Sequence, residues 1–150
     1  MSAEFRSSSI PDSATPPPLF TWPVRVYWED TDAGGVVYHA SYLRFLERAR
    51  TEWLRSLGIG QSEVRDRDNV VFVLRDLSIA FAKPARLDDE LRVTIESVER
   101  RSASMTFSQC ILRDAQDVLV RAQIRVACVS ADRFQPRRIP ANLFTENPTA

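Results

Sequence analysis

The clearest pattern of hydrophobic and polar positions lies between about Ala40 and Leu57. Apolar side chains recur there every three or four residues, at Tyr42, Phe45, Leu46, Ala49, Trp53 and Leu57. This spacing places them on one face of an α-helix and leaves the charged residues on the opposite face. Gly58 follows, at a position where a helix end favours a left-handed residue. The pattern therefore predicts a long amphipathic helix that packs against one apolar surface.

Alternating apolar and polar positions predict five β-strands around this helix. One strand precedes the helix at Val24–Trp28, with Pro23 at its start. Four strands follow the helix, at Val71–Phe81, Leu91–Glu99, Ser104–Leu112 and Val118–Cys128. The last strand alternates most regularly, because its apolar residues fall on one face and its arginines on the other. This arrangement is typical of a sheet with one buried face.

Short connections between the last three strands favour antiparallel hairpins, because a parallel crossover needs about a dozen or more linking residues. About 18 helical residues span about 27 Å, and five strands span about 24 Å, so one helix can cover the apolar face of the sheet. The polar segment Gln61–Asn69 has the length of a short helix. The prediction is an α+β fold, with one long helix lying across the apolar face of an antiparallel sheet of five or slightly more strands.

The chain is predicted to hold one domain between two tails. Residues 1–20 are rich in serine and proline and lack an apolar period, which predicts a disordered tail. Residues 21–141 form the expected domain, and residues 142–150 a C-terminal tail. The 150 residues, 44% of them apolar and 27% charged, have the balance of a globular domain and the length of a single one.

Charge and cysteine usage narrow the function classes. The 20 basic and 20 acidic residues balance, so no overall field attracts nucleic acid. No secretory signal and no apolar run long enough to span a membrane is present. Cys110 and Cys128 fall in separate strand-like runs and are expected to be buried free thiols rather than a disulfide or metal site. The sequence therefore predicts a cytoplasmic protein.

The loop Glu29–His39 carries the candidate chemistry. It contains Asp32, two glycines and His39, the only histidine of the chain, just before the predicted helix. An aspartate is ionised at neutral pH and can activate water or attack a carbonyl carbon. The unpaired N–H groups of a helix start can stabilise negative charge on an oxygen. Together these features favour acyl transfer.

The run Tyr27–His39, followed by Tyr42-Leu43 and Phe45–Arg50, resembles the hot-dog-fold acyl-CoA thioesterases of the hydroxybenzoyl-CoA thioesterase group. Within this group it is most similar to the YbgC-type enzymes associated with the Tol-Pal system. The resemblance extends from about Phe20 to Pro140. It implies a hot-dog fold, in which the sheet wraps around the long helix. It also implies homodimers or homotetramers with active sites at the subunit interface.

The same resemblance implies the reaction and its residues. The expected reaction is hydrolysis of acyl-CoA, or of acyl carrier protein thioesters, without a metal or redox cofactor. Coenzyme A then belongs to the substrate. The catalytic aspartate of the family falls on Asp32 and its histidine on His39. Backbone amides near Val37, Tyr38 and His39 are expected to face the thioester carbonyl.

Several alternatives stay open at this stage. Asp32 can act as general base or as nucleophile, and His39 can orient water, bind the carbonyl or only stabilise the helix start. Asp30 is expected to pair with a helix arginine, and Glu47 to be a structural glutamate that is ion-paired with its neighbours Arg48 and Arg50. A hot-dog dehydratase acting on hydroxyacyl thioesters and a non-catalytic acyl-thioester or carrier-protein binding module are the alternative functions.

Overall fold

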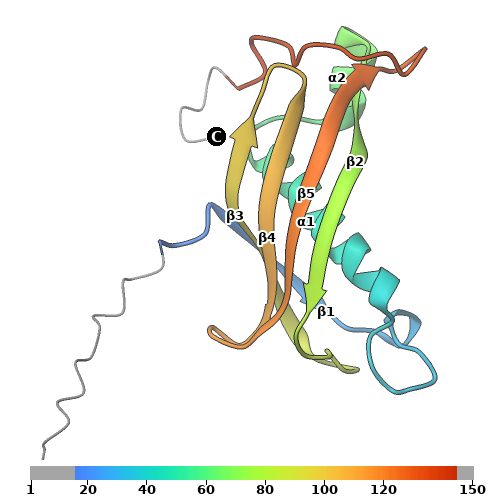
Figure 1. Cartoon of the computed structure of the whole chain (residues 1–150), viewed down its shortest axis with the longest axis vertical. Helices are drawn as coiled ribbons and strands as arrows, with labels where there is room; N and C mark the ends of the chain where they lie inside the picture. Colours follow the sequence, from blue (N-terminus) through green and yellow to red (C-terminus); the bar gives the residue numbers. More distant parts are fainter. Residues whose placement is uncertain (1–15, 145–150) are drawn as a thin grey trace, which may run out of the picture.

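A five-stranded antiparallel sheet curves around the long helix α1 in the computed structural model, which describes residues 16–144 (Figure 1). The helices are α1 (His39–Ser56) and α2 (Gln61–Asp68). The strands are β1 (Phe20–Arg25), β2 (Val70–Phe81), β3 (Glu90–Arg100), β4 (Ser104–Arg113) and β5 (Val118–Ser130). The predicted α+β class, the long helix and the short second helix are confirmed. Most of the predicted N-terminal tail, residues 1–15, lies outside the described residues.

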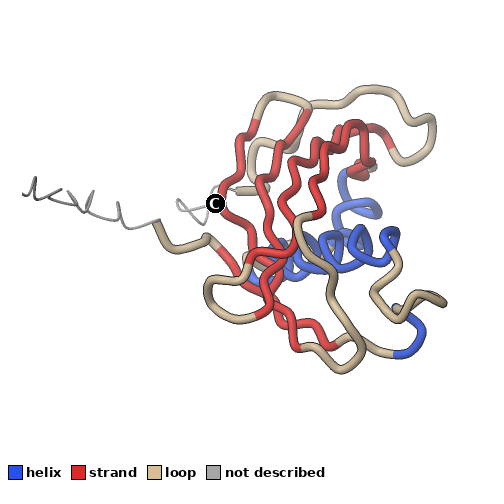
Figure 2. Tube along the Cα trace, turned by 60° about the horizontal axis from the view of Figure 1, so that its bottom comes forward, coloured by secondary structure: helices blue, strands red, loops and turns tan. Residues whose placement is uncertain are grey.

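The strands lie in the order β1-β3-β4-β5-β2, so β1 and β2 form the two edges of the sheet. The neighbours β3, β4 and β5 are joined by the short connections that predict hairpins. β2 instead pairs with β5, from Val70 opposite Ser130 to Phe81 opposite Val120. Both helices lie on the same side of the sheet (Figure 2).

The core lies between α1 and this face of the sheet. The stripe residues of α1 are each at most 3% exposed: Tyr42, Phe45, Leu46, Ala49, Trp53 and Leu54. The Trp53 ring meets the Phe107 ring of β4 edge to face, with centroids 5.6 Å apart. Burial of one large apolar side chain contributes about 1.5–3 kcal/mol, so this stripe fixes the position of the helix on the sheet. No helix in the described residues is long and apolar enough to cross a membrane.

One polar pair interrupts the apolar contact between α1 and β4. Arg50 donates to Gln109 Oε1 at 3.0 Å, and Gln109 Nε2 donates to the Leu46 carbonyl oxygen at 3.1 Å. Burial lowers the pKa of Arg50 to about 10, and the negative charge of Glu47 opposes this shift. Glu47 accepts the hydroxyl of Thr51 at 3.0 Å. Glu47 therefore contacts Thr51 and interacts with Arg50 through its charge, but within residues 16–144 it forms no salt bridge, so the expected ion pair is only partly realised.

The first strand begins earlier than the sequence predicts. β1 ends at Arg25, whereas the alternation suggests a strand that continues to Trp28. Val26 keeps the expected burial, but a 3-10 turn over Trp28–Asp30 then turns the chain outward and leaves Trp28 79% exposed. Pro23 lies within β1, which is an edge strand and therefore tolerates a residue that cannot donate a backbone hydrogen bond.

The folded part continues beyond residue 141, where the sequence places the start of a tail. Phe144 is 7% exposed and belongs to the core cluster. Its ring stacks on Trp53 with centroids 6.1 Å apart, and the Arg100 guanidinium lies 4.4 Å from its centre. Phe144 therefore anchors the C-terminal segment at the end of α1, a role that an isolated aromatic residue in a polar sequence does not reveal.

We expect Phe144→Ala to lower the free energy of unfolding by about 3 kcal/mol, because the substitution leaves a cavity beside Trp53. Phe134→Ala is the matched control, since Phe134 is 63% exposed and its loss should change stability by less than about 0.5 kcal/mol. Urea denaturation of both variants measures the difference. Equal stabilities would contradict the anchoring role.

Candidate active site

The loop that carries Asp32 is held by its own backbone. The Asp32 N–H donates to the Val36 carbonyl oxygen at 2.9 Å, and the Gly35 N–H donates to the Asp32 carbonyl oxygen at 3.0 Å. Gly35 has φ of 78°, a conformation that glycine adopts without steric cost. The Gly34 N–H donates to Asp32 Oδ1 at 2.8 Å. Asp32 is exposed, and the hydrogen bond from Gly34 orients its carboxylate at the surface of the single chain.

Asp30 is buried beneath this loop and has a structural role. Asp30 Oδ2 accepts the Tyr27 N–H at 2.9 Å, and Oδ1 lies 3.7 Å from Arg44 Nη2. The expected ion pair between Asp30 and a helix arginine is thus confirmed. The Asp30 carbonyl oxygen accepts the Tyr38 N–H at 2.8 Å and the Ser41 hydroxyl at 3.3 Å. Asp30 therefore connects the loop to the first turn of α1, and Asp32 is the exposed one of the two aspartates.

Some backbone N–H groups at the start of α1 already donate a hydrogen bond, and others have no backbone acceptor among the described residues. The Val37 N–H donates to the Ala85 carbonyl oxygen at 2.9 Å, and the Tyr38 N–H is used by Asp30. In the described part of the chain, the N–H groups of His39 and Ala40 have no such backbone acceptor. Of the expected oxyanion donors near Val37, Tyr38 and His39, the N–H groups of Val37 and Tyr38 are thus already hydrogen-bonded. The first free N–H of the helix is that of His39.

The side chains around the helix start divide into exposed and buried ones. His39 is exposed, and its ring lies 4.4 Å from the Tyr38 ring. Tyr42, one turn further along, is buried, and its hydroxyl accepts the Ala85 N–H at 2.9 Å. Burial raises the pKa of Tyr42 above its ordinary value, and the charge of Asp32 adds to this rise. The exposed His39 and the buried Tyr42 thus lie one turn apart on α1.

Ala85 is the neighbour of the site that sequence reasoning missed. It lies in the β2–β3 connection, is fully buried, and bonds to both Val37 and Tyr42. An alanine more than 40 residues from the motif carries no chemical signal in the sequence. Its role comes from its backbone N–H and carbonyl groups, which every residue except proline has.

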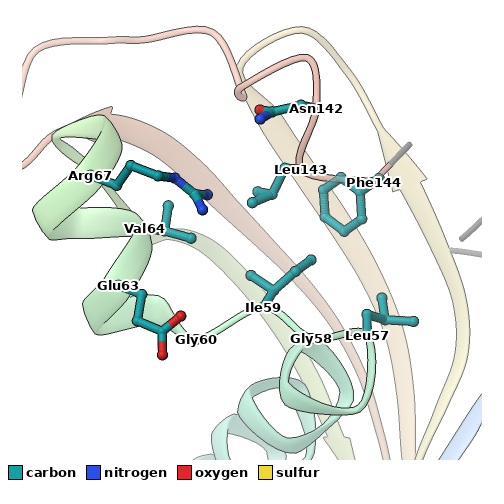
Figure 3. A pocket seen from close by; sticks show the side chains of 10 residues that line it. All are labelled: Leu57, Gly58, Ile59, Gly60, Glu63, Val64, Arg67, Asn142, Leu143 and Phe144. Atoms are coloured by element: carbon teal, nitrogen blue, oxygen red, sulfur yellow. The ribbon is translucent and has the colours of Figure 1, made fainter. Parts of the chain in front are cut away.

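Two cavities of the chain lie elsewhere. A cavity of about 180 Å³ lies at the C-terminal end of α1, where Arg67 reaches from α2 toward Leu143 and Phe144 (Figure 3). It is separated from the helix start by the length of an 18-residue helix, about 27 Å. A larger cavity of about 1270 Å³ lies over outward-facing residues of the sheet, including Arg92, Thr94 and Gln123. Neither cavity is lined by Asp32 or His39.

Comparison with known proteins gives consistent results. The family model for the Thioesterase-like superfamily matches residues 26–144. The chain is 45% identical over 128 residues to the acyl-CoA thioester hydrolase YbgC of Escherichia coli O6:H1, which covers 85% of this chain and 95% of that protein. It is 46% identical over 121 residues to the acyl-CoA thioesterase YbgC of Haemophilus influenzae, covering 81% and 88% of the two chains.

A solved structure agrees with this result. The crystal structure of a probable thioesterase from Bartonella henselae superposes with a TM-score of 0.75 at 35% identity. The superposition covers 80% of this chain and 98% of the other. The residues matched by the family model, 26–144, include the loop with Asp32, helix α1 and strands β2 to β5.

Proposed function

The chain belongs to the thioesterase-like superfamily and has its hot-dog fold, and we propose that it is an acyl-CoA thioester hydrolase whose chemistry depends on Asp32 and the His39 N–H. Relatives that cover most of the chain are named as acyl-CoA thioester hydrolases. One observation carries the assignment of residues. An exposed carboxylate on a rigid loop stands seven positions before the first free N–H of α1.

The reaction divides between these two groups. As the carbonyl carbon of the thioester is attacked, negative charge moves to the carbonyl oxygen. The His39 N–H, at the positive end of the helix dipole, stabilises this oxygen, and one such donor is worth about 3–4 kcal/mol. The carbon–sulfur bond then breaks, and the thiolate of coenzyme A leaves with the bonding electron pair.

The Asp32 carboxylate supports two forms of attack. As a general base it takes a proton from water, and the resulting hydroxide adds to the carbonyl carbon. As a nucleophile it adds directly and forms an acyl anhydride, which water then hydrolyses to the free acid. The hydrogen bond from the Gly34 N–H to Oδ1 orients the carboxylate in both routes.

We propose that the working unit is a homodimer formed through the edge strand β2, either alone or as half of a tetramer. Within residues 16–144, β2 pairs only with β5, so the outer edge of this 12-residue strand has no strand partner there. Its side chains facing α1 include Leu74, Leu77 and Phe81, which are 55%, 36% and 50% exposed. Long apolar edges of this kind pair with other strands. Phe81 also lies 5.6 Å from the Tyr42 ring, so the edge ends beside the candidate site.

We further propose that the enzyme acts in the cytoplasm. Cys110 and Cys128 are both free and buried, which suits a reducing compartment. The resemblance to YbgC-type enzymes supports a role alongside the Tol-Pal envelope system. Carrier protein thioesters are the second donor to compare with acyl-CoA, since both present the same thioester group.

We expect Asp32→Asn to lower kcat by at least 100-fold, because the amide can neither take a proton from water nor attack the carbonyl. Thiol release is measured with short-chain, long-chain and aromatic acyl-CoA and with an acyl carrier protein thioester. Asp66→Asn, at an exposed position of α2, is the matched control and should keep most of the activity. A folded Asp32→Asn protein with near-normal turnover would contradict the proposed mechanism.

We expect Leu77→Lys to dissociate the dimer, because two symmetry-related lysines near the middle of β2 would repel each other in an apolar contact. Light scattering after size exclusion should then give the 17.1 kDa mass of one chain. The rate of thiol release should decrease as the fraction of dimer decreases. Ser78→Lys is the control, since Ser78 lies on the opposite face of the same strand. Retention of the parental mass by Leu77→Lys would contradict pairing through β2.

A further inference from the structure

A cluster of ionic side chains surrounds Arg113, the last residue of β4. Arg113 Nη1 donates to Asp89 Oδ2 at 3.1 Å and to the Pro84 carbonyl oxygen at 3.3 Å. Arg113 Nε and Nη2 donate to Asp117 Oδ2 at 3.3 and 3.0 Å. Lys83 Nζ donates to Asp117 Oδ1 at 2.7 Å. One guanidinium therefore joins the β2–β3 connection to the hairpin between β4 and β5.

The segment that Arg113 holds is the one that contacts the candidate site. Ala85 lies between Pro84 and Asp89, and its carbonyl oxygen accepts the Val37 N–H. The Ala85 N–H donates to the buried hydroxyl of Tyr42. One residue thus fixes both the loop that follows Asp32 and the first turns of α1. The position of Ala85 depends in turn on what holds residues 83–89.

We propose that Arg113 is a positioning residue for thioester hydrolysis, which holds residues 83–89 so that Ala85 fixes the Asp32 loop relative to the His39 N–H. This inference rests on the proposed function of Asp32. Arg113 acts through Ala85. Its effect is to limit the distance between the carboxylate and the amide that must act on one carbonyl.

The energetics favour positioning over bulk stabilisation. The Arg113 side chain is 30% exposed, and ion pairs in contact with water contribute little to folding. Geometry has a larger effect, because a displacement of about 1 Å at the reacting groups can reduce a rate by about 100-fold. The planar fork of arginine reaches two carboxylates and a carbonyl at fixed angles, and the point charge of lysine does not. Arg113 should therefore affect turnover far more than stability.

The test compares Arg113→Lys and Arg113→Ala with Arg101→Ala. Arg101 is the matched control, since it pairs with Glu99 at 3.3 Å in an exposed position next to the β3–β4 hairpin. The measurements are kcat and KM for acyl-CoA hydrolysis, the melting temperature, and amide hydrogen exchange. Ethylguanidinium is added to each variant to replace the missing guanidinium. Asp117→Asn is a milder variant that keeps the contact between Arg113 and Asp89.

Both Arg113 variants should lower kcat about tenfold or more, with KM within twofold and with the melting temperature close to that of Arg101→Ala. Ethylguanidinium should raise the kcat of Arg113→Ala several-fold. It should leave the kcat of the parent and of Arg101→Ala unchanged. Amide exchange should accelerate in residues 36–42 and 82–89. Asp117→Asn should show smaller changes in the same segments.

Unchanged exchange in residues 36–42 in folded Arg113 variants would overturn the inference. So would a kcat within twofold of the parent, or a rise in KM alone. The exchange measurement also separates the two proposals. If the parent releases no thiol while exchange at 36–42 still depends on Arg113, the proposed hydrolysis is wrong and the structural coupling remains.

Discussion

The structure depends on the burial of one face of α1 against the sheet. This contact fixes where the helix begins, and the site is built around that beginning. Asp30 bonds to the first turn through its carbonyl oxygen, and Ala85 bonds to Tyr42 and to the segment after Asp32. The loop with the exposed carboxylate and the first turn of α1 with the free N–H of His39 are therefore joined through two buried residues, Asp30 and Ala85. An enzyme gains by this arrangement, since the reacting groups need no reorganisation when the substrate binds.

The sequence predicts those parts of the fold that depend on local periodicity. The apolar stripe of α1 and the alternation in β5 each follow from burial on one face, so the bounds of both elements are predicted within two residues, although the buried Leu54 takes the place in the stripe that the sequence assigns to Leu57. The edge position of β2 could not be predicted, because its pairing with β5 joins segments about 50 residues apart. Trp28 and Phe144 were also misplaced, because a 3-10 turn exposes the first and a contact with Trp53 buries the second.

The same limit applies to the site. The motif marks Asp32 and His39 by their residue types. Which backbone amides are free depends on the acceptors that tertiary structure brings to them. The Val37 N–H donates to the Ala85 carbonyl oxygen, and the Tyr38 N–H donates to that of Asp30. No periodicity or motif in the sequence predicts either hydrogen bond. The candidate site is exposed in the single chain, and the exposed apolar edge of β2 ends next to it, at Phe81 and Tyr42. The proposed pairing of two copies through β2 would therefore cover this edge and one side of the site.

We propose that Asp32 and the His39 N–H act on the same carbonyl group. A crystal structure of the protein with an acyl-CoA analogue, in which a methylene group replaces the thioester sulfur, would locate that group. We expect a carbonyl oxygen about 2.9 Å from the His39 nitrogen and the Asp32 carboxylate beside the carbonyl carbon, directly or through one water. A carbonyl group bound away from the start of α1, with Asp32 directed into solvent in every subunit, would contradict it.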